Sequence, residues 1–460
     1  MNPLRTVNFR LQAFMDEAGL NGDGLARSIR AVGDQVGLSL RCGRATVGQW
    51  LRGRNPRPPI PTLAAEALSR ALDRDVSPAH LGFEADSSED LAFWHERSVA
   101  GQLQVLHQLD NVSGPCQNPR VYRVAALRPP IWDEPPPDLA RPSTTRPLGT
   151  GRLGRAEVED AETMLRLFGQ ADSRAGAGHV RPALARYLAD QIRVWTTAPA
   201  RDDIRRELLA IAARLAYLCG FLFFDDELHG TAQRYYHVAA ELAREAGRPG
   251  PHAMALRALS VQARLLGHPR PALALAEASL SDAPTDCDPL TRAFLTGQLA
   301  VAHAADGDRY RALRQLSATE HWFAKGCDRV DAPMAYNHAS LAHQKAAVLA
   351  LLHQRPQAIA ALELSVRQRP AHERRSRAIT KARLAELQLS HGHLEQATAT
   401  WHTFLDDYRC ILSGRARSAL AIMRASLRPY KNNRLAGEVL RRALALPYVG
   451  LGGGQSMVRV

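Results

Sequence analysis

Six alanines recur at nearly constant intervals through the C-terminal part of the chain. The intervals are 40, 40, 46, 39 and 39 residues, between Ala232, Ala272, Ala312, Ala358, Ala397 and Ala436. The residue seven positions after each alanine is small in five of six cases, as is the residue twelve positions before it. Small residues at fixed places let two antiparallel helices approach closely, and each pair leaves an apolar face that must stack on the next. The spacing predicts an α-solenoid of helix pairs.

This pattern of small and bulky residues resembles the tetratricopeptide repeat. Bulky residues stand four positions after most of the alanines, as at Tyr236, Leu316 and Trp401. The period of about 40 is longer than the usual 34, so each helix is expected to gain up to a turn. An earlier helix pair, near 156–173 and 180–196, is expected to cap the stack.

Composition divides the chain into zones. Residues 1–83 are expected to form a helix-turn-helix domain, and 84–155 a helical segment with a Pro-rich linker. Seven of the nineteen residues from Pro129 to Pro147 are proline, which favours an extended spacer. Residues 156–446 are the predicted tetratricopeptide-like domain, and 447–460 a flexible tail. The fold class expected from this pattern is all-α.

Charge favours an acidic partner. The chain holds 59 Lys and Arg against 46 Asp and Glu, a net charge of +13. Nucleic acid is the first candidate and an anionic membrane surface the second. Only four of the cations are lysine, so arginine is the default cation and an Arg-rich patch is weaker evidence here than elsewhere.

The remaining general features point to the cytoplasm. Six scattered cysteines without a C-x-x-C pair indicate free thiols in a reducing compartment. The N-terminus lacks the apolar segment of a signal peptide. The longest apolar run, Leu208 to Phe224, contains Arg214 and is expected to fall short of a membrane span.

The stretch RATVGQWLRGRNPR, residues 44–57, has the pattern of a DNA-reading helix. Val47, Trp50 and Leu51 lie at i, i+3 and i+4 and are expected to face the core, with Trp50 as an anchor. Gly53 fits a helix stop, and Pro61 the first turn of the next helix. A short helix with Gln and Arg on its outer face suits the major groove, where Gln bonds adenine and Arg bonds guanine.

The predicted DNA contacts come from this helix and its flanks. Between residues 41 and 57 there are five arginines and no acid, whereas the rest of 1–83 has six arginines and seven acids. Arg54 and Arg57 follow the helix stop and are expected to touch phosphate. The alternative is a solvated basic helix in a domain that now serves protein contacts. The full predicted set is Arg41, Arg44, Thr46, Gln49, Arg52, Arg54 and Arg57.

TVGQWLRGRNPRP resembles the recognition helix and following loop of Cro/repressor-type helix-turn-helix proteins. Residues 24–83 are similar to the variant helix-turn-helix of a group of actinomycete regulators that continue into tetratricopeptide-like repeats. Residues 175–192, AGAGHVRPALARYLADQI, also look like that group. The resemblance implies a role in development or secondary metabolism. One departure is the roughly ten residues from Gly33 to Gly43, where the standard motif has a tight turn.

These features predict a cytoplasmic transcriptional regulator that binds double-stranded DNA and is expected to act as a homodimer. Its repeats would bind a peptide, small-molecule or protein effector. The alternative is a tetratricopeptide-type adaptor whose first domain no longer reads DNA. No residue constellation supports catalysis, no cofactor is implied, and His391 and His393 have no third metal ligand nearby in the sequence.

Overall fold

The computed structural model describes residues 7–36, 38–83, 92–94, 96–112, 120–127, 152–284, 287–326 and 336–446. The chain divides into two compact units. The first comprises Met1–Arg128 with Glu227–Arg234 and Gly450–Val460, and the second Pro129–Asp226 with Tyr235–Val449. The predicted Pro-rich spacer, 129–147, and the predicted tail, 447–460, lie outside the described residues.

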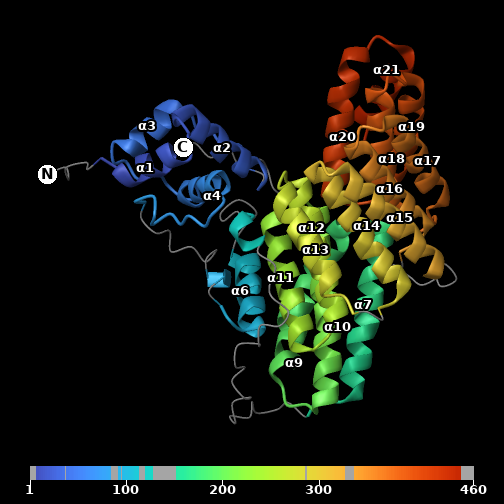
Figure 1. Cartoon of the computed structure of the whole chain (residues 1–460), viewed down its shortest axis with the longest axis horizontal. Helices are drawn as coiled ribbons and strands as arrows, with labels where there is room; N and C mark the ends of the chain where they lie inside the picture. The colour runs from blue at the N-terminus through green and yellow to red at the C-terminus, as the bar shows by residue number, and fades with distance from the viewer. Residues whose placement is uncertain are drawn as a thin grey trace. The chain divides into compact units, whose positions relative to one another are not determined.

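Short helices build the first unit (Figure 1). They are α1 Phe9–Glu17, α2 Gly22–Asp34, α3 Arg44–Leu51, α4 Ile60–Leu72, α6 Val99–Val112 and the 3-10 turn η1 Val124–Leu127. The side chains of Asn8 and Asn21 cap α1 and α2 by accepting hydrogen bonds from amides of the first turn. Leu11, Ile29 and Leu63 are fully buried, so the apolar faces of α1, α2 and α4 meet in one core.

Residues beyond 83 complete this unit. The Val124 amide donates to the buried Glu66 carboxylate of α4 at 3.1 Å. The Arg123 amide donates to Gln233 Oε1 at 2.9 Å, and Gln233 Nε2 donates back to the Arg123 carbonyl at 2.7 Å. Residues 120–127 are therefore fixed against α4 and against the segment 227–234.

Helix pairs build most of the second unit, following one another from α10 to α21 in Figure 1, and the first residues of α11 are assigned to the first unit. It begins with α7 Arg155–Ala175, α8 Ala177–Tyr187, the π-helical turn η2 Leu188–Ile192 and α9 Arg193–Thr197. The pairs are α10 Asp202–Asp225 with α11 His229–Glu245, α12 Pro249–Leu265 with α13 Pro269–Ser281, α14 Pro289–Asp306 with α15 Arg309–Gly326, α16 His338–Leu351 with α17 Arg355–Gln368, α18 Arg374–Ser390 with α19 Leu394–Tyr408, and α20 Gly414–Leu427 with α21 Arg434–Leu444.

The recurring alanines lie near the start of the second helix of every pair. All six have no exposed surface, which is the burial expected where two helices touch. The all-α, tetratricopeptide-like solenoid predicted from their spacing is therefore confirmed. The small residues seven positions later also form hydrogen bonds between helices: the hydroxyls of Ser279 and Ser365 donate to the carbonyls of Ala253 and Ala339, each at 2.7 Å.

Tight turns join the two helices of a pair, and in five of the six pairs the backbone is left-handed five residues before the alanine. Gly307 (φ 90°) and Gly392 (φ 88°) occupy this position, where the missing Cβ removes the steric cost. Glu227 (φ 63°) and His353 (φ 59°) adopt the same conformation in two other pairs. Because these two are not glycines, the glycine pattern alone did not reveal their turns.

The predicted cap, α7 and α8, has a wider role than covering one end of the stack. Helix α7 packs on α10 and also on α18. The Leu412 amide donates to the Ala175 carbonyl at 2.8 Å, and the Gly178 amide donates to the Leu412 carbonyl at 3.1 Å. At Gly176 an added Cβ would lie 2.5 Å from the Leu412 carbonyl oxygen, so this approach requires glycine.

A buried ionic cluster joins the same elements. Arg375 of α18 bonds Asp172 of α7 at 2.9 Å and lies 3.6 Å from Asp225 of α10. Arg415 of α20 donates to Asp225 at 2.8 Å. Burial raises the pKa of Asp172. Burial also acts to raise the pKa of Asp225, but the guanidinium groups of Arg415 and Arg375 outweigh it and hold that pKa below its ordinary value.

Helix α10 contains the longest apolar run. By length and composition it could cross a membrane, which the sequence argument from Arg214 did not expect. Yet 72% of its apolar window is buried inside the fold. Since a core helix passes the same test, its apolar character is explained by packing.

Enlarging a recurring alanine should destabilise the repeat domain. In α17, Ala358 is fully buried whereas Ala360 is exposed. Ala358→Leu should lower the free energy of unfolding by about 1–3 kcal/mol, because the larger side chain would push the two helices apart and their packing contacts would be lost. Ala360→Leu should change it by less than about 0.5 kcal/mol. Urea unfolding followed by circular dichroism checks this, and equal effects of the two changes would contradict the packing.

Removing the central cation of the buried cluster should be costly. Arg375→Leu removes the guanidinium group that faces Asp172 and Asp225, and the expected loss in unfolding free energy is about 3–5 kcal/mol. Arg374→Leu alters the partly exposed neighbour and should cost less than about 1 kcal/mol. Urea unfolding of both variants measures these two losses in unfolding free energy. A loss at Arg375 no larger than at Arg374 would show that the cluster does not hold α7, α10 and α18 together.

Candidate nucleic-acid interface

Helix α3 is anchored to the first unit by its apolar face. Val47 has no exposed surface and Trp50 is 3% exposed, while Leu51 is half-buried. The indole of Trp50 packs edge-on against Phe83, with ring centroids 6.3 Å apart. This is the arrangement that the i, i+3, i+4 spacing predicts, and it turns the opposite side of the helix outward.

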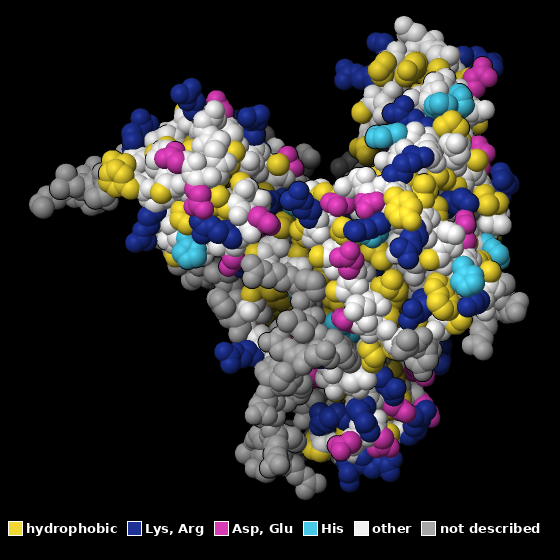
Figure 2. All heavy atoms as spheres, in the orientation of Figure 1, with side chains coloured by type: hydrophobic (Ala, Val, Ile, Leu, Met, Phe, Trp, Pro, Cys, Tyr) yellow, Lys and Arg dark blue, Asp and Glu magenta, His cyan; other side chains and the backbone are white. Residues whose placement is uncertain are grey.

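That opposite side carries most of the predicted DNA contacts. Arg44, Gln49 and Arg52 are exposed on α3 or at its end, and Arg54 and Arg57 are exposed in the loop that follows. Arg41 is exposed ahead of the helix. Cationic side chains project from the surface of the first unit in Figure 2. The predicted residues thus share one short segment of surface.

The arginines of this segment differ from others of the first unit in their partners. Among the residues that the structure describes, Arg44, Arg52, Arg54 and Arg57 form no ion pair. In contrast, Arg70, Arg74 and Arg123 bond Glu66, Glu17 and Asp75 at 2.8, 2.6 and 2.8 Å. Positive charge without an acidic partner is therefore present at α3 and its loop, as a phosphate-binding surface requires.

Two polar side chains of α3 have local partners. Arg54 donates to Gln49 Oε1 at 2.6 Å, which holds the amide of Gln49 beside the loop. Thr46 is half-buried, and its Oγ1 accepts from the Gly43 amide at 3.5 Å, a long contact within the N-terminal cap of α3. Thr46 thus has a local structural role, and its contact with DNA stays a prediction.

The long connection between α2 and α3 is part of the core. Leu38, Leu40 and Cys42 are buried in it. The Leu38 amide donates to the Gly33 carbonyl at 2.9 Å, and Arg30 donates to the Cys42 carbonyl. Burial raises the pKa of the Cys42 thiol, so this cysteine packs as an apolar side chain. Although longer than a standard turn, the connection fixes the position of α3.

The far end of α3 is fixed as well. The Asn8 amide donates to the Leu51 carbonyl at 2.9 Å, and Asn8 Nδ2 donates to the Leu81 carbonyl at 2.8 Å. One exposed cation of the first unit was not singled out from the sequence. Arg27 lies on the outer face of α2, as the burial of Leu25 and Ile29 indicates, and forms no ion pair with any described residue.

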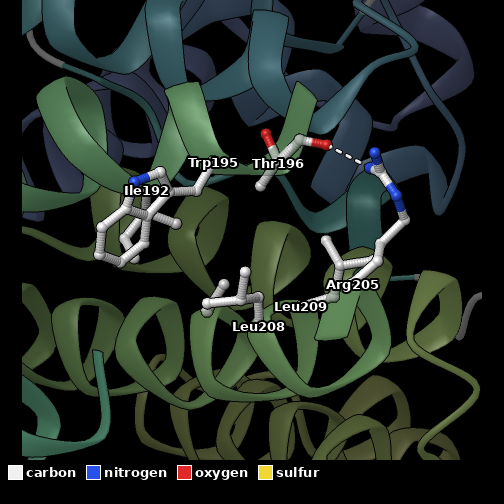
Figure 3. Close-up of a pocket in the computed structure, with 7 residues that line it drawn as sticks. Ile192, Trp195, Thr196, Arg205, Leu208 and Leu209 are labelled. Atoms are coloured by element: carbon white, nitrogen blue, oxygen red, sulfur yellow. Dashed lines mark hydrogen bonds between the residues drawn. The ribbon is translucent and has the colours of Figure 1, made fainter. Parts of the chain in front are cut away.

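Two hollows lie in the described part of the second unit. The one in Figure 3 lies between Trp195, Leu208 and Leu209, and Arg205 donates to the Thr196 carbonyl beside it at 2.8 Å. Its volume of about 10 Å³ admits roughly one water molecule. A second hollow, about 310 Å³, is lined by charged side chains such as Arg206 and Glu207. Among the described residues no His, Cys, Asp and Glu group could hold a metal ion.

Comparisons with known proteins bear on the two units separately. Residues 11–84 match the family model described as SP15 N-terminal domain. No curated protein matches the chain. Two solved structures are similar to part of this chain: the nearly identical TPR-like repeats of a putative kinesin light chain from Podosopora anserina, and a form of the same protein with one substitution. Both are 21% identical with a TM-score of 0.32. Each match covers 43% of this chain and 96% or 95% of the other. The repeat architecture rests on the helix packing described above.

Proposed function

We propose that the chain is a cytoplasmic DNA-binding transcriptional regulator in which α3 lies in the major groove. The observation that carries the proposal is the contrast within α3: Val47 and Trp50 are buried, while Arg44, Gln49 and Arg52 are exposed. A helix fixed by one face and presenting Arg and Gln on the other has the side chains that read guanine and adenine. The arginines without acidic partners supply the phosphate contacts.

The roles of the individual side chains follow from their positions. Arg44, Gln49 and Arg52 would reach base edges because they belong to α3 or its final turn. Arg54 and Arg57 follow the left-handed turn at Gly53 (φ 85°) and would contact phosphates. The bond from Arg54 to Gln49 would hold the Gln49 amide in position before DNA arrives. Such preorganisation reduces the entropy lost on binding.

The repeat domain would serve dimerisation and the binding of an effector or partner. Helix-turn-helix proteins commonly act as dimers, so that two reading helices contact successive half-sites. A solenoid offers an extended surface for a peptide, a protein or a smaller ligand. If the first unit bound no DNA, the same repeats would instead make the chain a protein-interaction adaptor.

Removing a base contact should weaken binding and relax specificity. Arg44→Ala, Gln49→Ala and Arg52→Ala should each cost about 1–3 kcal/mol of affinity for a genomic target, with the loss concentrated on the preferred sequence. Fluorescence anisotropy with the target and with a scrambled duplex measures both effects. Arg74→Ala is the matched control, since it removes one charge from an arginine paired with Glu17 in the same unit. Equal losses for all four variants would contradict a reading role for α3.

Phosphate contacts should show in the salt dependence. Arg57→Ala should weaken binding to all sequences alike and reduce the slope of log affinity against log salt by about 1. The slope is measured by titrating duplex DNA at several salt concentrations. Capture of genomic fragments by the full chain identifies the targets in the same series. Failure of the wild-type chain to retain any fragment at low salt would overturn the DNA proposal and leave the adaptor.

A further inference from the structure

Arginines from several repeats act electrostatically on one histidine of the second unit. His343 of α16 is partly buried, and its Nδ1 lies 3.3 Å from Thr380 Oγ1. Its pKa is lowered to about 3, first by burial and then by the charges of Arg369, Arg415, Arg264 and Arg383. These residues come from α12, α18, α20 and the end of α17. Arg264 and Arg369 are partly buried, whereas Arg383 is exposed and bonds Glu386.

Most of the interior arginines are neutralised within the fold. Arg369 bonds Glu373 at 2.7 Å, and Arg415 bonds Asp225 at 2.8 Å. Arg375 bonds Asp172 at 2.9 Å. A guanidinium taken out of water needs such a partner, because its desolvation costs several kcal/mol. Any arginine left without a carboxylate in these surroundings therefore requires an explanation.

Arg257 of α12 is one such residue. Its guanidinium carbon lies 3.3 Å from the centroid of the Phe294 ring, and Phe294 packs against Tyr336 with centroids 5.0 Å apart. Among the described residues no carboxylate pairs with Arg257, and its Nε has no hydrogen-bond partner. Burial lowers its pKa, and the phenol groups of Tyr217, Tyr336 and Tyr236 oppose that shift, Tyr217 also through a side-chain hydrogen bond to Arg257. That bond uses only part of the guanidinium, which has five N–H donors. Part of the side chain still reaches solvent.

Arg264, on the same helix, is the second arginine without a carboxylate partner among the described residues. It follows Arg257 by seven residues, which is two helical turns or about 10 Å along α12. In the described part of the chain it has no ion-pair partner, and its Nε makes no hydrogen bond. Burial and then the charge of Arg383 lower its pKa to about 10. Like Arg257, it remains partly exposed.

We propose that Arg257 and Arg264 form a binding site for a ligand that carries carboxylate or phosphate oxygens. A guanidinium stacked on an aromatic ring keeps its N–H edge available, and that edge fits a carboxylate or phosphate in a bidentate pair. The stacking on Phe294 compensates part of the desolvation of Arg257, and the oxyanion would compensate the rest.

The assignment of this ligand as an effector rests on the proposed regulator function, whereas the binding itself does not. An oxyanion that binds between α12, α14 and α16 would tie neighbouring helix pairs together, since α12 packs on α14 and α14 on α16. A ligand that binds only this arrangement stabilises it by mass action. The site would therefore couple the presence of an anion to the rigidity of the repeat array.

The test measures the melting temperature and the affinity of the full chain at constant ionic strength. The two probes are a tetraglutamate peptide and inorganic phosphate, with chloride as reference. We expect at least one probe to raise the melting temperature. Arg257→Gln and Arg264→Gln should each weaken binding of that probe about tenfold or more. Arg374→Gln removes a partly exposed arginine of α18 and should leave the affinity unchanged. Whichever probe binds more tightly identifies the source of the oxyanion.

Specific outcomes decide against the site. The proposal is overturned if neither probe binds the wild type, or if both arginine variants bind as well as the wild type. Should Arg257→Gln fail to fold because its stacking on Phe294 is lost, Arg264→Gln alone decides, since no aromatic contact holds Arg264 among the described residues. DNA binding is measured on the same samples. If the chain binds an oxyanion but no DNA, the proposed regulator function is wrong and the proposed oxyanion site still holds.

Discussion

The contact between two helices at a fully buried alanine is the interaction on which the second unit depends. A larger side chain there would separate the helices of a pair and remove the surface on which the next pair stacks. The six alanines repeat this contact, and hydroxyls such as that of Ser279 use the short distance to reach a carbonyl of the partner helix. Contacts between residues of different pairs, such as that of Arg415 with Asp225, depend on this spacing.

Charge is handled differently in the two units. Inside the repeat domain, buried carboxylates such as Asp172 and Asp225 are matched by guanidiniums, which makes the cluster specific for one arrangement of α7, α10, α18 and α20. On α3 the arginines are exposed and have no acidic partner in the described residues. Buried, paired charges are typical of a structural contact, and exposed arginines without acidic partners are typical of a surface that binds an anionic partner.

Sequence periodicity predicted the buried face of α3 because the spacing of Val47 and Trp50 depends only on helix geometry. It could not predict that the connection from α2 would pack Leu38, Leu40 and Cys42 into the core, because that packing involves α4 and the segment near residue 121. Nor did it reveal the pairing of Gln49 with Arg54 or the capping position of Thr46, which depend on side-chain rotamers.

The sequence by itself determined the helical class, the six repeat units and the outer face of α3, since each of these is set by contacts close along the chain. Only the tertiary structure decided which charges are neutralised. Asp172 and Arg375 are 203 residues apart in the sequence, and no local sequence pattern predicts their contact. For the same reason Arg257 and Arg264 looked like ordinary arginines of an Arg-rich chain. Their lack of a carboxylate became visible only when the helices that surround them were in place.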